Sequence, residues 1–294
     1  MRGRGLVTSL LALVLTGCVM LSRTPPSFGT PAAAGTYRAL PKPAHVVVVW
    51  EENKAFGQII GNPAAPYINR LARHGALMTR AYGVTHPSEP NYLAFFSGST
   101  HGLHDDDCPY RFRGPNLATR LAASGYSFTL YAEGLPHAGD ATCGHGEYAR
   151  KHNAVADYPG LAPAASVPLR RFPRRFSKLP TVSWVIPDLV HDMHSASIAA
   201  GDRWLKKHIG PYVRWARHHD SLLIIAWDED DYRHHNHIPL ILVGPMVRPG
   251  RYRQAVNHYS VLRTLEAMYG LKPIGQSARA VPLTQIWKSP PGNG

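Results

Sequence analysis

Four short apolar runs constrain the fold of this chain more than any other feature of its sequence. They are residues 44–50 (AHVVVVW), 181–187 (TVSWVIP), 221–227 (SLLIIAW) and 238–244 (IPLILVG). Unbroken apolar runs of this kind, rich in β-branched residues, are typical of strands that are buried on both faces of a parallel sheet. The runs therefore predict the central strands of a buried, mostly parallel sheet.

Helical patterns lie between these runs. Residues 65–75, 114–125 and 258–270 carry apolar side chains at helical spacing, and each segment ends in glycine. The alternation predicts an α/β fold, a single layered domain with a mostly parallel central sheet and helices on both faces. A length of 294 residues, 44% of them hydrophobic, is enough for one large domain of this type or for two small ones.

Polar residues with carboxylate, amide or imidazole groups follow the first three apolar runs. They are Glu51, Glu52 and Asn53 after the first run, Asp188, His191, Asp192 and His194 after the second, and Asp228, Glu229, Asp230 and Asp231 after the third. The fourth run begins directly after His237. Because ligands bind outside the carboxyl ends of parallel strands, we expect these side chains to converge on one crevice. A single strand end is often polar only because the loop that follows it is exposed to water, but three such ends favour a functional site.

Carboxylates that share one crevice repel each other and are costly to remove from water unless a cation joins them. A divalent metal ion fits this need, held by oxygen ligands with some imidazole. The sequence therefore predicts a metal site at the carboxyl edge of the sheet.

Ser88 stands between two prolines in the stretch THPSEPNYLAFFSGS, residues 85–99. One interpretation is a helix cap, since serine is a favoured N-cap and proline is favoured in the first turn. The other is a nucleophile, because helix N-terminal amides favour an anion and a nearby metal ion would activate the hydroxyl. The setting is not Gly-x-Ser-x-Gly, so an α/β-hydrolase nucleophile is not supported.

The N-terminus, MRGRGLVTSLLALVLTGC, has a basic start and an apolar run over residues 6–15 that is too short for an ordinary membrane span. We expect residues 1–17 to be a lipoprotein signal peptide, because Leu-Thr-Gly-Cys resembles a bacterial lipobox. Residues 18–42 would then be a lipidated Cys18 and a flexible tether, and residues 43–294 the catalytic domain. The chain would be exported and lipid-anchored to the outer face of the cytoplasmic membrane or cell envelope. A plain secretory signal with an incidental cysteine is the alternative.

Export also bears on the other two cysteines, Cys108 and Cys143. An oxidising compartment favours a disulfide between them over a metal site built from two such distant residues.

The charge balance indicates anionic surroundings, since 32 Lys and Arg against 19 Asp and Glu give a formal net charge of +13. The chain carries no nucleic-acid-binding motif, so we expect no nucleic acid partner. The arginines at 170, 171, 174 and 175 form a local group, which we interpret as a solvated surface.

Taken together, these motifs are similar to those of the bacterial phosphoesterase family of acid phosphatases and phospholipases C, within the alkaline phosphatase superfamily. The matching pieces cover residues 44 to 271 in family order. They are VVVVWEENKAF, HPSEPNYLAFFSGS, YAEGLP, YARKHN, IPDLVHDMHS, IIAWDED, NHIPLILVGP and HYSVLRTLEAMYGL.

The resemblance implies a role for each matching position. It implies five metal ligands, which are Glu52, Asn53, Ser88, Asp228 and Glu229. Ser88 would be the nucleophile that forms a phosphoserine, and Asn91 would bind a phosphoryl oxygen. His152 and His191 would face the phosphate or the leaving group, with His237 as a further catalytic residue. The remaining positions would be supporting residues that surround the metal ligands without binding the metal; they are Asp188, Asp192 and His194.

One departure from the wider superfamily concerns the number of metal ions. Two-metal members use an Asp-x-x-x-His element. Here the fourth position after Asp188 is Asp192, and neither His191 nor His194 has the required spacing from Asp188. We therefore expect one divalent metal ion of unspecified identity. The run 233–235 is interpreted equally well as a ligand cluster or a solvated loop, and Glu51 and Asp230 as supporting or exposed residues.

The expected function is that of a metal-dependent phosphoric ester hydrolase, an acid-phosphatase-like phosphomonoesterase. A phospholipase C or phosphodiesterase is the first alternative, and a surface lipoprotein that binds phosphate without turnover is an alternative of another class. The leaving-group pocket, which would separate monoesters from diesters, is expected within residues 102–180.

Overall fold

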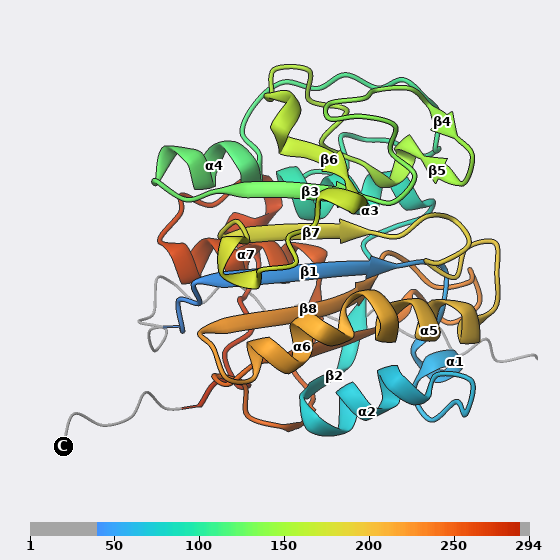
Figure 1. Cartoon of the computed structure of the whole chain (residues 1–294), viewed down its shortest axis with the longest axis vertical. Coiled ribbons are helices and arrows are strands. Elements are labelled where there is room, and N and C mark those ends of the chain that lie inside the picture. Colours follow the sequence, from blue (N-terminus) through green and yellow to red (C-terminus); the bar gives the residue numbers. More distant parts are fainter. Residues whose placement is uncertain (1–39, 289–294) are drawn as a thin grey trace, which may run out of the picture.

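The structure is a computed structural model that describes residues 40–288. The predictions for the signal peptide, for Cys18 and for the tether up to residue 39 lie outside the described residues. A nine-stranded sheet forms the centre of the molecule, with strand order β10-β2-β9-β8-β1-β7-β3-β6 and β11 beside β2 (Figure 1). The strands are β1 (His45–Glu51), β2 (Ala76–Tyr82), β3 (Phe128–Ala132), β6 (Ser166–Pro168), β7 (Val182–Ile186), β8 (Ser221–Trp227), β9 (His237–Val243), β10 (Gly250–Tyr252) and β11 (Val256–Asn257).

The sheet is mostly parallel, as predicted, and β1 lies at its centre. Val47 pairs in parallel register with Ser183 of β7 and with Leu223 of β8. Residues 46–50 of β1, four valines and a tryptophan, are fully buried, which explains why these positions are all apolar. Strand β9 corresponds to the fourth apolar run but is antiparallel to both of its neighbours, β8 and β2.

Helices cover both faces of the sheet, which confirms the layered α/β prediction. They are α1 (Phe56–Ile59), α2 (Pro66–His74), α3 (Ser88–Ser97), α4 (Leu117–Ala123), α5 (Ile198–His208), α6 (Gly210–Ala216) and α7 (His258–Tyr269). In Figure 1, α5 and α6 lie in front of the sheet and α3 and α7 lie behind it. The three predicted helices correspond to α2, α4 and α7, and Gly270 ends α7 with a φ of 65° that favours glycine.

Residues 102–180 contain α4, β3 and β6, and long connecting loops join them. The segment also contains the hairpin of β4 (Gly144–His145) and β5 (Tyr148–Ala149) and the short 3₁₀ helices η1 (Arg150–His152), η2 (Pro163–Ala165), η3 (Leu169–Arg171) and η4 (Phe176–Lys178). A further 3₁₀ helix, η5 (Gly275–Arg279), follows α7. Cys108 and Cys143 form a disulfide in this segment, with Cα atoms 5.8 Å apart, which confirms the predicted pair. Between residues 40 and 288, no helix has the length and the apolar character needed to cross a membrane.

Candidate active site

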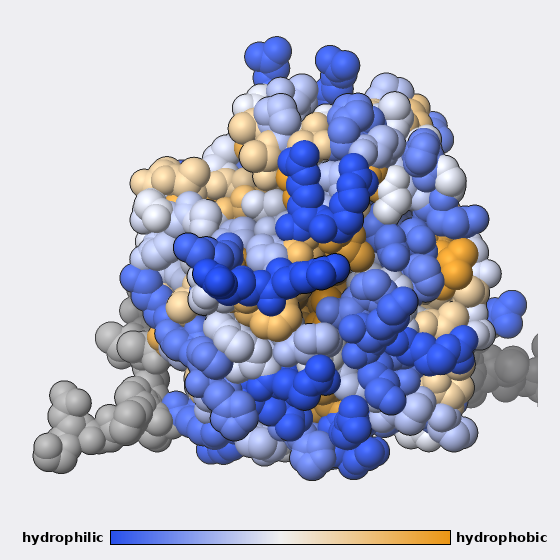
Figure 2. All heavy atoms as spheres, viewed as in Figure 1, coloured by the Kyte–Doolittle hydropathy of each residue, from blue (hydrophilic) through white to orange (hydrophobic). Residues whose placement is uncertain are grey.

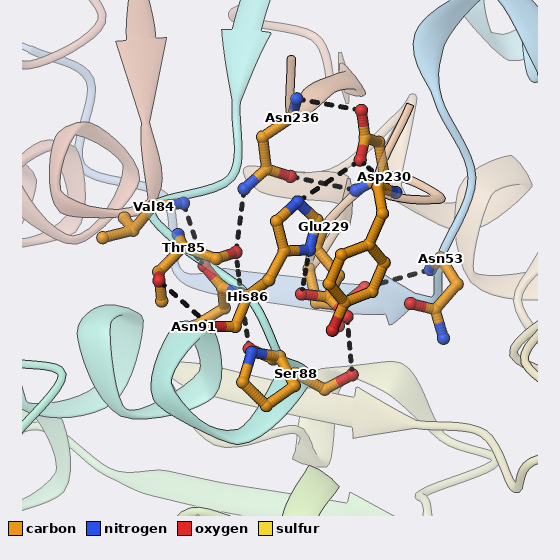
Figure 3. A network of polar contacts seen from close by, with 12 residues as sticks. Asn53, Val84, Thr85, His86, Ser88, Asn91, Glu229, Asp230 and Asn236 are labelled. Carbon is orange, nitrogen blue, oxygen red and sulfur yellow. Dashed lines mark hydrogen bonds and ion pairs between the residues drawn. The ribbon is translucent and has the colours of Figure 1, made fainter. Parts of the chain in front are cut away.

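The carboxyl ends of β1, β7 and β8 meet at one edge of the sheet, and α3 begins beside them. Ser88 Oγ, at the first position of α3, lies 3.0 Å from Glu52 Oε2. It also lies 3.3 Å from Glu229 Oε1 (Figure 3). The backbone N–H of Asn53 donates to Asp228 Oδ1 at 3.1 Å, and its side-chain Nδ2 lies 3.3 Å from Glu52 Oε2. The five predicted ligands therefore converge, although they come from three separate parts of the chain.

The structure also tests the helix-cap interpretation of Ser88. The N-cap of α3 is Pro87, and no side chain caps this helix end. The Ser88 hydroxyl instead faces the carboxylates of Glu52 and Glu229 and is 1% exposed. A helix-capping role is thus excluded for Ser88.

The carboxylates of the site are buried and short of partners. Burial, followed by repulsion from Asp228 and Asp192, raises the pKa of Glu52 well above its usual range. Burial also raises the pKa of Asp228, and it raises the pKa of Asp192 to about 7. Asp228 Oδ2 and Asp192 Oδ2 are buried and accept no hydrogen bond. Such orphaned acceptors fit a divalent cation with oxygen ligands.

His152 adds an imidazole to this cluster. Its Nε2 lies 3.2 Å from Glu52 Oε1 without hydrogen-bond geometry, and its Nδ1 lies 3.3 Å from Asp192 Oδ2. One donor atom from each of these three residues lies within 4.8 Å of the others, the spacing of a possible metal site. Burial lowers the pKa of His152 well below its usual range, which favours the neutral imidazole that binds metals. Asp192, predicted as a supporting residue, thus lies directly beside Glu52.

Tyr92 and His86 contact the site, although neither was singled out in the sequence. Tyr92, one turn after Ser88 on α3, donates its hydroxyl hydrogen to Glu52 Oε1 and stacks on the His152 ring with centroids 5.0 Å apart. His86 Nδ1 lies 2.7 Å from Glu229 Oε2, and its Nε2 lies 3.4 Å from Asp230 Oδ1. The signal for Tyr92 was its i+4 spacing from Ser88, and the signal for His86 was its position two residues before it.

A lysine lies close to the same helix end. Lys151 Nζ is 2.8 Å from Asp106 Oδ2, and Asp106 Oδ1 accepts the backbone N–H of Glu89 at 2.8 Å. Burial opposes the charge of Lys151, but the hydrogen bond to Asp106 and the nearby Glu52 raise its pKa. The predicted supporting residue His194 also lies near this lysine, with its Nε2 3.4 Å from Lys151 Nζ.

Two of the predicted catalytic histidines lie elsewhere. His191 Nδ1 is 3.0 Å from Glu133 Oε2 and 2.9 Å from Asp188 Oδ1, in a separate, partly exposed cluster. His237 Nε2 lies 3.1 Å from the carbonyl oxygen of Thr79, and its ring stacks on Phe56. No contact described for residues 40–288 joins either histidine to Ser88, so their expected place beside the phosphate or the leaving group stays a prediction.

Three residues for which the sequence left alternatives open can now be placed. Glu51 is fully buried, which excludes the exposed alternative, and both of its carboxylate oxygens lack a hydrogen-bond partner. Asp230 is also buried, and it accepts the N–H groups of Tyr232, His234 and Asn236. His234 pairs with the neighbouring Asp231 at 2.6 Å in the same surface loop.

Asn91 has a different role from the one expected. Its Oδ1 accepts the N–H groups of Val84 and Thr85, and its Nδ2 donates to the carbonyls of Thr85 and Pro87 (Figure 3). Both of its amide hydrogens are used within the loop that leads into Ser88. Asn91 therefore holds this loop, and it has no free hydrogen to donate to a phosphoryl oxygen.

We expect Asn91→Ala to lower the free energy of unfolding by about 2 to 4 kcal/mol, since each buried backbone group left unpaired costs roughly 1 to 3 kcal/mol. Urea denaturation would measure the change, and kcat should fall because the loop that positions Ser88 loosens. An unchanged unfolding midpoint with a raised KM would instead support the role in substrate binding that was expected for Asn91 from the sequence.

Comparison with known proteins adds a second line of evidence. A family model described as the phosphoesterase family matches residues 62–272. A phosphatidylinositol-3-phosphatase from Mycobacterium tuberculosis is 48% identical over 252 residues, which cover 85% of this chain and 84% of that protein. A phosphate-repressible acid phosphatase from Penicillium chrysogenum is 27% identical over 252 residues, covering 78% of this chain and 60% of the relative.

Solved structures extend the likeness to the fold. The lipoteichoic acid synthase LtaP from Listeria monocytogenes matches with a TM-score of 0.60 and 12% identity, over 87% of this chain and 79% of that one. A phosphonate monoester hydrolase from Silicibacter pomeroyi matches with a TM-score of 0.56 and 12% identity, over 85% of this chain and 78% of that one. A protein of the alkaline phosphatase superfamily from Vibrio parahaemolyticus also matches, with a TM-score of 0.54 and 13% identity, over 86% of this chain and 73% of that one. Identities this low support the shared fold alone.

Proposed function

The chain belongs to the phosphoesterase family and is a hydrolase of phosphoric esters, and from this premise we propose that it is a metal-dependent, acid-phosphatase-like phosphomonoesterase that acts through a phosphoserine at Ser88. The observation that carries the proposal is the buried Ser88 hydroxyl, which lies within 3.3 Å of two carboxylates at the start of a helix. A protein that only bound phosphate would need no such hydroxyl, which weighs against the binding-protein alternative.

Ser88 Oγ attacks the phosphorus in line while the bond from phosphorus to the ester oxygen breaks on the opposite side and releases the alcohol, and Glu52 Oε2 is the nearest acceptor for the serine proton. The Lys151 ammonium group, held by Asp106, offsets charge on the phosphoryl oxygens. Water then hydrolyses the phosphoserine, so that two inversions give net retention at phosphorus. A divalent cation held by Glu52, Asn53, Asp228 and Glu229 would supply the positive charge that lowers the pKa of the Ser88 hydroxyl.

The cleft beside the nucleophile is where we place the leaving group. A cavity of about 560 Å³ lies between residues 84–86 and 230–236. Another, of about 340 Å³, lies within residues 102–180, where the leaving-group pocket was expected from the sequence. Tyr232, which is 65% exposed, stacks on His86 at its wall, with ring centroids 4.0 Å apart. Segment 102–180 contributes Asp106, Lys151 and His152 to the site.

The names of the relatives support the proposed substrate class. The names phosphatidylinositol-3-phosphatase and acid phosphatase both describe the removal of a terminal phosphate, so we propose phosphomonoesters, phosphorylated lipids included, over diesters. We also propose that the chain is exported and anchored through Cys18. The disulfide between Cys108 and Cys143 supports export, because such bonds persist in oxidising compartments.

The test compares two chromogenic substrates. We expect kcat/KM for p-nitrophenyl phosphate to exceed that for p-nitrophenyl phosphorylcholine by roughly a hundredfold or more, since a site shaped for a terminal phosphate excludes the second ester group. The reverse order would favour the phospholipase C alternative. Tight phosphate binding without release of nitrophenol from either ester would favour the binding protein.

A further inference from the structure

A second cavity lies on the front face of the molecule, away from Ser88. It has a volume of about 370 Å³ and lies between residues 169–176 and the junction of α5 and α6. Its volume is within the range of small-molecule sites in proteins. Figure 2 shows dark blue, hydrophilic side chains gathered around an orange hollow on the face that carries α5 and α6.

The floor of this cavity is apolar and firmly packed. It is formed by Leu169, Phe172, Phe176 and Pro211, of which the first three are only partly buried. The Phe172 ring meets Tyr131 edge-on at 5.1 Å. The Phe176 ring packs against Tyr212 and Trp215 at 5.6 and 5.8 Å. The floor is therefore held in place by the core and is not a loose surface loop.

The rim is basic. Arg170, Arg174, Lys207 and His208 line the cavity together with this floor, and we call the whole the basic groove. No acidic residue lines it among the described residues. Lys207 and His208 stand in the last turn of α5, where positive charge is common because it complements the helix dipole. Arg170 lies in the three-residue η3 and Arg174 in no helix, so the dipole of a long helix explains neither arginine.

An apolar floor below a basic rim fits a partner that carries both anionic groups and apolar chains. We propose that the basic groove docks the protein on membranes that contain anionic phospholipids, with lipid phosphates on the basic rim and acyl chains against Leu169 and Phe172. Juxtaposed Lys and Arg residues are attracted to anionic lipid surfaces, and apolar side chains that enter the interface add to the affinity. A soluble acidic polymer would satisfy the rim but leave the apolar floor uncovered.

The groove is independent of the proposed chemistry. None of its lining residues contacts Ser88 or the carboxylates around it in the described part of the chain. A smaller cavity of about 280 Å³ adjoins it past Arg170 and His208 and reaches Glu133, the partner of His191. The docking surface therefore leads toward the edge of the sheet where the strands end.

The test is vesicle binding of the full chain carrying Cys18→Ala, so that no N-terminal lipid contributes. Vesicles of phosphatidylcholine alone are compared with an equal mixture of phosphatidylcholine and phosphatidylglycerol. We expect Arg174→Glu with Lys207→Glu to weaken binding to the mixed vesicles by about tenfold or more. Both side chains are exposed, and neither makes a hydrogen bond or ion pair given for the described residues. Leu169→Asn, which keeps the charge, should weaken binding several-fold.

The matched control is Arg251→Glu with Arg253→Glu, which makes the same change in net charge around β10, at the opposite edge of the sheet. This control should bind within about twofold of the parent chain. All variants should hydrolyse p-nitrophenyl phosphate normally, which checks their folding. Equal losses in the two double variants, or no loss in either, would overturn the proposal. Retention by heparin in preference to the mixed vesicles would also overturn it, in favour of an acidic polymer.

Discussion

Replacing Ser88 by alanine is expected to lower kcat for p-nitrophenyl phosphate by about 10⁴-fold or more, the size of loss typical when an enzyme loses its nucleophile. The variant should fold normally, because the N-cap of α3 is Pro87 and the Ser88 hydroxyl does not cap the helix. Its effect would therefore be chemical and not structural. Steady-state rates and the urea unfolding midpoint, measured on the same preparation, separate the two.

Trapping the intermediate tests the same assignment directly. Acid quenching during turnover of a ³²P-labelled ester should leave label on the wild-type chain and none on Ser88→Ala. Ser97→Ala is the matched control, since Ser97 is a buried serine of the same helix whose hydroxyl donates to the Leu93 carbonyl. It should keep both turnover and label. Label on the Ser88→Ala chain would assign the nucleophile to another residue.

The parts of this molecule that the sequence predicts are those fixed by local rules. An unbroken β-branched run must be buried on both faces, so the central strands and their acidic ends could be placed without a structure. The direction of each strand could not be predicted, because an apolar run such as residues 238–244 is compatible with both parallel and antiparallel pairing. Its neighbours in the sheet make β9 antiparallel.

Side-chain roles depend on contacts that sequence spacing does not encode. Glu51 and Glu52 are adjacent, yet only Glu52 reaches Ser88, since alternate side chains point to opposite faces. Asn91 belongs to the right motif, but its amide is occupied by four backbone groups. Among 17 histidines, composition could not single out His86, whose partner Glu229 lies 143 positions away.

Removing the metal ion is expected to lower activity by about 10³-fold or more and to lower the stability of the chain as well. The reason is electrostatic, because Glu52, Asp228 and Asp192 are buried beside one another and repel when no cation offsets them. A chelator should thus lower the unfolding temperature, and a divalent ion should restore both the temperature and the activity. Differential scanning calorimetry with metal analysis checks the binding independently of turnover.

A charge-removing variant distinguishes a metal site from an ordinary acidic cluster. Asp228→Asn should bind less metal and be less active, yet its unfolding temperature in chelator should exceed that of the chelated wild type, because one buried negative charge is gone. Asp107→Asn, at an exposed carboxylate, is the control and should leave metal content and both temperatures unchanged. If chelation changes neither stability nor activity, the buried carboxylates are held without a cation. The activation of Ser88 would then have to come from Glu52 and Glu229 alone.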